Sequence, residues 1–299
     1  MSDVVVRGAR ESRFTLERES GQELLSRLIA ANAAAGLSPL RLLVVVAHPD
    51  DEAIGAGALL HGYPDAMIVH LTDGGGGDLA SVLARGFTTR EEYALARRRE
   101  VVAALSLVGI PSTRVRCLGI PDGEAGRRLL DVSRLVMDLI DDVHPDVVLT
   151  HPYEGGHTDH DAAAFAVHMA AGVLRREGVG APLVLELTSY HNRDGERVRG
   201  QFLPNEEVPE AQLLLGDEER ELKRRMFDAF TTQQEVVRPF QLDVERFRVA
   251  PRYIFTEPPH SGMLDYERRC VRITGAEWRA MAEQALLALR ARRRAHVAH

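Results

Sequence analysis

The chain has 299 residues, and its 45% hydrophobic and 27% charged content is that of a soluble globular protein. Its formal net charge of −7 argues against nucleic acid as the main partner, because a phosphate-binding surface needs a basic face. A single lysine, Lys223, stands among the 37 basic residues, which leaves almost no candidate for a P-loop or Schiff-base lysine. Two cysteines, Cys117 and Cys270, make neither a disulfide framework nor a cysteine-based zinc site.

No apolar stretch approaches the roughly 20 residues that a membrane-spanning helix needs. The polar residues 1–16 contain no signal-peptide core. We therefore expect a cytoplasmic protein without a membrane span. The sequence gives no indication of the oligomeric state.

The predicted elements begin, after an irregular stretch over residues 1–18, with a helix over residues 21–35. Residues 42–47 form an apolar, largely β-branched run, which is typical of a strand buried on both faces of a parallel sheet. Pro49 ends this strand because proline cannot donate a hydrogen bond to the ladder. A helix rich in small residues is predicted over residues 52–60.

Further strands and helices then alternate along the chain. The strands are predicted over residues 66–72, 114–118, 145–150 and 183–190, and the helices over 89–108, 127–143 and 161–176. This alternation predicts an α/β fold, with a mostly parallel sheet and helices on both faces.

The pattern changes at residue 201. A charged helix is predicted over residues 217–231, mixed extended segments up to residue 255, and a final helix over 276–294. We interpret residues 1–299 as a single domain, with a core of about 39–200, an N-terminal helical extension of about 1–38 and a C-terminal elaboration of about 201–299.

Polar clusters follow the first and fourth predicted strands. His48, Asp50 and Asp51 lie on the turn after the first strand, and His157 and His160 begin the helix after the fourth. Right-handed crossovers place the carboxyl ends of parallel strands on one rim of the sheet. Imidazoles and carboxylates suit catalytic zinc, and a cation would offset the repulsion between neighbouring carboxylates. Either cluster alone is also consistent with helix capping or ordinary packing, but the two together predict a metal site.

The motifs Ala47-His-Pro-Asp-Asp-Glu52 and Gly155-Gly-His-Thr-Asp-His160 resemble those of the LmbE-like, or PIG-L-type, zinc-dependent N-deacetylases. That family includes deacetylases of the mycothiol pathway, of glycosylphosphatidylinositol synthesis and of glycopeptide antibiotics. The resemblance covers about residues 41–171, with both motifs in the family's order. It implies a Rossmann-like fold, and a hydrolase that removes an N-acetyl (N-acyl) group from a small-molecule amino sugar or glycoconjugate.

Carried over residue by residue, the resemblance implies that His48, Asp51 and His160 bind Zn2+ and leave the fourth position open to water. Asp50 matches the general base that takes a proton from the metal-bound water. His157 matches the residue that stabilises the oxyanion or protonates the leaving amine. Ligands of these types also admit another divalent metal such as Fe2+.

Three more positions match the family. Asp159 is expected to orient the His157 side chain without itself binding the metal. Arg97 resembles a substrate-contacting arginine of the mycothiol-pathway enzyme, and Asp122 resembles an acid there that holds sugar hydroxyls. The alternatives are a solvated helix face for Arg97 and a simple turn former for Asp122.

The chain also departs from that relative. Between Gly156 and His157 it lacks the short insertion in which the relative carries a site tyrosine, and Tyr153 lies nearby without aligning with it. The relative's substrate is therefore not implied for this chain. His191 and His260 are interpreted as ordinary surface or loop histidines.

Other classes of protein were weighed. A nicotinamide-binding Rossmann protein is disfavoured, because Gly55-Ala-Gly57 lacks a third glycine at Leu60 and falls inside a predicted helix. A metallohydrolase acting on another amide or an ester, of the thioconjugate amidase type, would use the same residues. A non-catalytic sugar- or metal-binding module would have no use for Asp50. The sequence does not predict the particular substrate.

Overall fold

The computed structural model describes residues 21–33, 40–178, 180–269 and 273–297. The stretch predicted to be irregular over residues 1–18 and Cys270 lie outside the described residues. The strands are β1 (Leu42–Val46), β2 (Met67–Thr72), β3 (Val115–Ile120), β4 (Val147–Thr150), β5 (Leu183–Leu187), β6 (Tyr190–Arg193), β7 (Glu196–Arg199), β8 (Glu210–Leu214) and β9 (Val244–Val249). The α-helices are α2 (Gly21–Ala33), α3 (Asp51–Ala56), α4 (Leu79–Ala84), α5 (Arg90–Ser106), α6 (Leu129–Val143), α7 (Thr158–Glu177), α8 (Asp217–Ala229), α9 (Gln234–Val237), α10 (Asp265–Arg269) and α11 (Gly275–Val297). Short 3₁₀ turns are η1 (Leu59–Gly62), η2 (Ser112–Arg114), η3 (Ala125–Arg127) and η4 (Thr231–Gln233).

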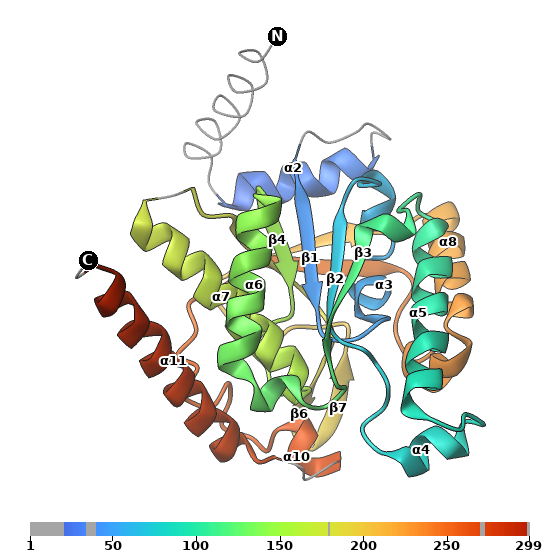
Figure 1. The fold of residues 1–299 in the computed structure, drawn as a ribbon. Helices are drawn as coiled ribbons and strands as arrows, with labels where there is room; N and C mark the ends of the chain where they lie inside the picture. Colours follow the sequence, from blue (N-terminus) through green and yellow to red (C-terminus); the bar gives the residue numbers. More distant parts are fainter. Residues whose placement is uncertain (1–20, 34–39, 179, 270–272, 298–299) are drawn as a thin grey trace.

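A seven-stranded sheet in the order β3-β2-β1-β4-β5-β9-β8 forms the centre of the molecule (Figure 1). The strands from β3 to β5 are parallel, whereas β9 runs antiparallel to β5 and β8 antiparallel to β9. The predicted α/β class with a mostly parallel sheet is confirmed. Residues beyond 201 extend this same sheet by two strands.

Each face of the sheet is covered by helices, and β1 shows why its sequence is apolar throughout. Leu42, Val44 and Val46 pack into one core with α2, α5 and α8. Leu43 and Val45 point to the other face and pack with α6, α7 and α11. Because side chains alternate between the two faces of a strand, a strand covered on both sides needs apolar residues at every position.

The segment after β5 differs from its prediction. The predicted strand over residues 183–190 ends at Leu187, and Tyr190 begins β6, which pairs with β7 in a separate two-stranded hairpin. Asp194 and Gly195 form the turn between them with φ of 54° and 88°. An Asp-Gly pair between two short extended runs is a hairpin signal that the sequence analysis missed.

Other elements were also not predicted. The short helix α4 follows the glycine-rich loop, and its N-cap Asp78 accepts a hydrogen bond from the Ser81 backbone N–H at 2.8 Å. The strands β8 and β9 lie in the region predicted only as mixed extended segments. None of the described helices combines the length and the apolar character that crossing a membrane requires.

Candidate functional site

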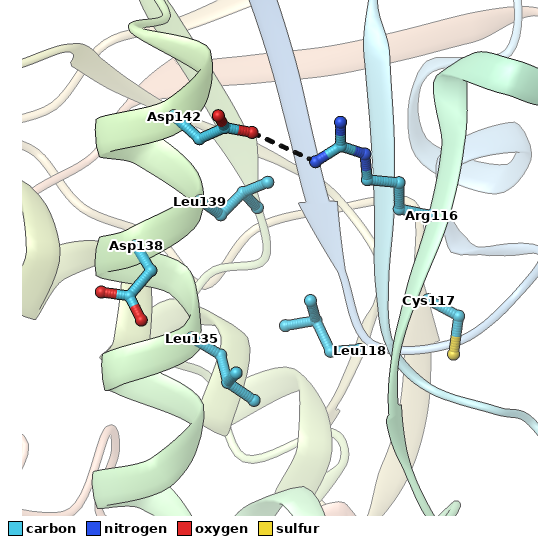
Figure 2. Close-up of a pocket in the computed structure, with 7 residues that line it drawn as sticks. All are labelled: Arg116, Cys117, Leu118, Leu135, Asp138, Leu139 and Asp142. Atoms are coloured by element: carbon cyan, nitrogen blue, oxygen red, sulfur yellow. Dashed lines mark hydrogen bonds and ion pairs between the residues drawn. The ribbon is translucent and has the colours of Figure 1, made fainter.

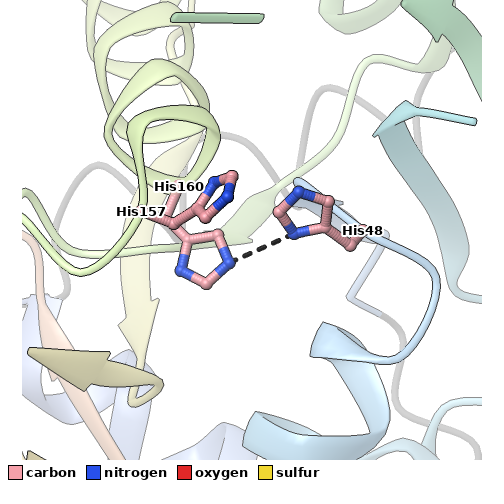
Figure 3. A group of neighbouring side chains, drawn as sticks. All are labelled: His48, His157 and His160. Atoms are coloured by element: carbon pink, nitrogen blue, oxygen red, sulfur yellow. Dashed lines mark hydrogen bonds between the residues drawn. The ribbon is translucent and has the colours of Figure 1, made fainter. Parts of the chain in front are cut away.

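The predicted site residues meet at the rim where the strand order reverses. The chain winds outward from β1 to β2 and β3 in one direction and to β4 and β5 in the other, so the reversal lies between β1 and β4. Ligands of open α/β sheets bind outside the carboxyl ends of the strands at this point. Figure 3 shows the imidazoles of His48, His157 and His160 converging there from the turn after β1 and the start of α7.

The three predicted metal ligands lie close together, and the two histidines face different oxygens of the Asp51 carboxylate. His48 Nδ1 lies 3.3 Å from Asp51 Oδ2, and His160 Nε2 lies 3.3 Å from both Asp51 Oδ1 and His48 Nδ1. Ligand atoms around a tetrahedral zinc ion with bonds of about 2.0–2.1 Å are about 3.3–3.4 Å apart. All three residues are buried. The arrangement therefore fits a divalent metal ion held by two imidazoles and one carboxylate.

The outer nitrogens of the two imidazoles face acceptors. His48 Nε2 lies 3.3 Å from Asp122 Oδ1 and 3.4 Å from Asp159 Oδ2. His160 Nδ1 lies 3.4 Å from Ser189 Oγ. A ring proton on these outer nitrogens leaves the inner lone pairs free for a metal, which is the usual arrangement behind histidine ligands.

Asp159 differs from its prediction, because its carboxylate contacts His48 rather than His157. The two carboxylate oxygens accept hydrogen bonds from the backbone N–H groups of Gly123 at 2.8 Å and Gly126 at 3.2 Å. Its contact with His157 runs through the backbone, where the Asp159 N–H donates to Nδ1 at 3.1 Å. Asp159 therefore ties the loop after β3 to His48.

Arg97 is held against the predicted general base. Its Nη2 donates to Asp50 Oδ2 at 2.9 Å and to the Pro49 carbonyl at 3.0 Å, and Nη1 donates to the Gly74 carbonyl at 3.2 Å. Only 4% of Arg97 is exposed, so the alternative of a solvated helix face is wrong. Burial raises the pKa of Asp50 to about 7, although the Arg97 charge opposes this rise. A carboxyl that titrates near neutrality suits general base catalysis.

Asp122 is an anion in the wall of the site. Its Oδ2 accepts a hydrogen bond from the Gly76 N–H at 3.2 Å, and its own N–H donates to Asp73 Oδ1 at 3.1 Å. Burial favours the neutral acid, but the charges of His48 and Arg97 outweigh it and hold the pKa of Asp122 below its usual range. The residue is therefore more than a turn former, since its carboxylate contacts other residues of the site.

His157 presents a neutral ring to the same space. Burial, reinforced by the neighbouring His48, lowers the pKa of His157 below its ordinary value. The two rings meet edge to face, with centroids 4.7 Å apart. Because Nδ1 accepts the Asp159 N–H, the proton of the neutral ring lies on Nε2, which makes that nitrogen a donor.

A cavity of about 330 Å³ opens beside these groups. Arg97, Asp122 and His157 line it. Four other segments, which the sequence analysis did not assign to the site, also contribute to the lining. They supply Ser81 and Arg85 at α4, Arg197 on β7, Gln233, and the pair Tyr266 and Ile273. Its polar lining suits a hydroxyl-rich ligand.

The β6–β7 hairpin brings an aromatic ring and a cation to the site. The Tyr190 ring lies 5.2 Å from the His160 ring, and the Arg197 guanidinium lies 4.3 Å above Tyr190. Arg197 Nε also donates to Asp265 Oδ2 at 2.9 Å. The Asp-Gly hairpin turn was the one sequence signal that could have indicated this contribution.

Other residues weighed from the sequence lie elsewhere. Tyr153 is a buried core residue stacked on Trp278, with ring centroids 5.3 Å apart. His191 is fully buried in β6, with Nδ1 3.2 Å from Glu154 Oε2, so its interpretation as a surface or loop histidine is wrong. His260 lies partly exposed in a loop.

A second hollow, of about 530 Å³, lies on the edge of the sheet (Figure 2). It is lined by Arg116, Cys117, Leu118, Leu135, Asp138, Leu139 and Asp142 of β3 and α6. Although it is larger, none of the predicted site residues is part of its lining. We place the candidate site at the smaller cavity, where buried titratable groups converge.

The fold and the site together define an α/β protein with a buried cluster of metal-ligand residues at the switch point of its sheet. A family described as PIG-L, GlcNAc-PI de-N-acetylase, matches residues 43–171. The chain is 31% identical over 157 residues to a Bacillus cereus protein named Probable N-acetyl-alpha-D-glucosaminyl L-malate deacetylase 2, an alignment that covers 51% of this chain and 70% of the relative. The chain therefore belongs to the PIG-L family, and the predicted family resemblance is confirmed.

A second relative is the 1D-myo-inositol 2-acetamido-2-deoxy-alpha-D-glucopyranoside deacetylase of Kineococcus radiotolerans, which is 31% identical over 178 residues. That alignment covers 48% of this chain and 49% of the relative, so the chain spans about half the length of this protein.

Solved structures share the fold. The A40926 pseudoaglycone deacetylase superposes with a TM-score of 0.53 at 20% identity, covering 72% of this chain and 99% of that chain. The 4-carboxy-2-hydroxymuconate hydratase of Pseudomonas putida superposes with a TM-score of 0.50 at 19% identity, covering 72% and 98%. At this identity the likeness shows the fold alone, and the two proteins are named for different reactions.

Proposed function

We propose that the protein is a zinc-dependent hydrolase that removes an N-acetyl (N-acyl) group from an amino-sugar-containing small molecule. His48, Asp51 and His160 would hold the metal. The observation that carries this proposal is the cluster of their donor atoms, with His48 Nδ1, His160 Nε2 and the Asp51 oxygens in contacts of 3.3 Å, beside a cavity that Arg97 and His157 line. The named activities of the two curated relatives, both deacetylases of acetamido sugars, support the substrate class.

The chemistry follows from what each residue can do. When bound, a divalent metal polarises the amide carbonyl and makes water acidic enough to attack near neutral pH. Asp50 would accept the proton of that water, and the rise of its pKa to about 7, caused by burial, suits that role. His157 donates its Nε2–H to the developing oxyanion or to the leaving nitrogen, so that acetate and a free amine are released.

The cavity bears on the size of the substrate. Small-molecule sites measure about 300–1,000 Å³, so this cavity of about 330 Å³ lies at the small end of that range. The anionic Asp122 and the neutral polar residues of its wall suit sugar hydroxyls. We therefore expect the acetamido sugar unit to fill the cavity, and any larger attached group to extend beyond it.

The first experiment measures primary-amine release from a panel of N-acetylglucosaminyl compounds, with Asp50→Asn protein alongside. We expect zinc-dependent release that a chelator abolishes and added zinc restores. Loss of the base should lower the rate about 10²–10⁴-fold without displacing the metal. Asp65→Asn, whose side chain is 82% exposed, is the matched control and should keep full activity.

Metal content is measured on every protein, so that chemistry and metal binding are separated. Protein that holds zinc but releases no amine from any sugar would overturn the amino-sugar assignment. Parallel panels of esters and thioconjugate amides then test the other hydrolase. If the parent protein bound a sugar of the panel but did not hydrolyse it, the result would instead indicate a binding module.

A further inference from the structure

Each proposed metal ligand is backed by a second group, and the group behind Asp51 is unassigned. His48 is backed by Asp122 and Asp159, and His160 by Ser189. Asp51 Oδ2 accepts the His48 backbone N–H at 2.7 Å and lies 3.3 Å from His48 Nδ1. A further neighbour of Oδ2 is His151, the residue that immediately follows β4.

His151 is fully buried and lies against two of the proposed ligands. Its Nε2 is 3.2 Å from Asp51 Oδ2. Its ring is parallel to that of His160, with centroids 4.0 Å apart and an interplanar angle of 4°. Because β4 pairs directly with β1, the end of β4 brings His151 beneath the turn that carries Asp51.

The same nitrogen also faces a donor, since the Ala47 N–H lies 3.2 Å from Nε2. Nε2 can donate to Asp51 or accept from Ala47, but one ring nitrogen cannot do both. A hydrogen bond to an ionised carboxylate is roughly twice as strong as one between neutral groups. The other tautomer would also bury an Nδ1–H for which no partner exists among the described residues. Both considerations favour a proton on Nε2.

We propose that His151 is a positioning residue that donates its Nε2–H to Asp51 Oδ2 and thereby reserves Asp51 Oδ1 for the metal. Asp51 Oδ1 is the oxygen that faces His160 Nε2, at 3.3 Å, whereas His48 Nδ1 lies 3.3 Å from Oδ2. With two donors on Oδ2, the carboxylate is fixed as a one-oxygen ligand, and the stacked His151 ring fixes the plane of His160. The inference rests on the proposed metal site, and it names a residue that raises the affinity of that site for the metal ion.

A competing role is that of a fourth metal ligand, because ligand atoms of Asp51, His151 and His160 lie within 4.8 Å of one another. The two roles predict different behaviour for two substitutions. His151→Phe keeps a flat ring against His160 and removes the donor. His151→Gln places an amide N–H near the position of Nε2. His61→Phe, at an exposed histidine, is the control.

The experiment measures zinc affinity by chelator competition, the visible spectrum of the Co2+-loaded protein, and thermal unfolding of the metal-free protein. We expect His151→Phe to weaken zinc binding about 10–100-fold, as loss of a group behind a ligand typically does. His151→Gln should retain most of the affinity, and the Co2+ spectrum should keep its shape and intensity in both variants. The metal-free variants should unfold close to the parent protein.

Three outcomes would overturn the proposal. Unchanged affinity in His151→Phe would show that the contact has no influence on the metal. Equal losses in both variants would assign the effect to the ring rather than to its proton. A Co2+ spectrum of altered coordination would make His151 a ligand. Failure of the parent protein to bind zinc would refute the proposed function itself, so the two failures are distinguishable.

Discussion

The contact between Arg97 and Asp50 leads to a prediction about the pH dependence of the reaction. The guanidinium lies 2.9 Å from the carboxylate and opposes the rise in the pKa of Asp50 that burial causes. A general base works when it is deprotonated, so the rate rises with pH through its pKa. Arg97→Gln removes the cation, raises the pKa of Asp50, and should move the acidic limb of kcat/KM to higher pH.

The magnitude follows from the size of such interactions. An opposite charge at this distance lowers the pKa of a carboxyl by about 1–3 units. Starting from about 7, Asp50 is half ionised at pH 7. Without Arg97 the ionised fraction would fall to between about one tenth and one thousandth, so kcat/KM at pH 7 should fall about 5- to 500-fold. The loss should shrink as the pH is raised.

The assay is kcat/KM for amine release across the pH range in which the protein stays folded. Arg99→Gln, on the exposed face of the same helix, is the matched control and should leave the profile unchanged. A uniform loss at every pH, with the limb in its original place, would refute the reasoning. Arg97 would then act on the substrate alone, as the family resemblance first suggested.

Two further predictions concern stability and the turn before α7. Lys223→Met should lower the free energy of unfolding in urea by about 3–5 kcal/mol, because it leaves Glu245 buried without a cation. The double variant Lys223→Met with Glu245→Gln should recover much of this stability. Gly156→Ala should sharply weaken zinc binding, because a Cβ there would lie 2.0 Å from the Tyr190 carbonyl oxygen and displace the turn that carries His157 and His160. Gly172→Ala in α7, where a Cβ meets only a flexible arginine end at 3.4 Å, should bind zinc normally. If the single and double Lys223 variants were equally stable, the prediction for Lys223 would be wrong. If the two alanine variants bound zinc equally well, the prediction for Gly156 would be wrong.

The parallel core could be predicted because its signals are local. An uninterrupted apolar run forms β1 because that strand is covered on both faces, and Pro49 marks where its ladder ends. The spacing of His157 and His160 places both at the start of α7. Strand ends of a parallel sheet share one rim, so topology alone indicated that the two clusters would lie close together.

The remaining features depend on long-range contacts that no local pattern encodes. Arg97 lies in a run of three arginines, and only the packing of α5 against the turn after β1 distinguishes it from Arg99. The Asp159 carboxylate reaches across to Gly123, 36 residues away. His151 gave no signal of its own, because a histidine at a strand end indicates a role only when its partner, Asp51 at the start of α3, is known.

The cavity is lined partly by the segment that the family matches and partly by later residues, which explains why the substrate could not be predicted. The family match covers residues 43–171, and this segment contains every proposed ligand, the proposed base and His157. Beyond it lie Arg197, Gln233, Tyr266 and Ile273, which line the same cavity. The proposed ligands, the proposed base and His157 therefore lie within the segment that the family matches, whereas part of the cavity wall lies outside it. Selection among acetamido sugars should follow that part of the wall, so substitutions at Arg197 or Gln233 should change the preferred panel member more than the rate on the best one.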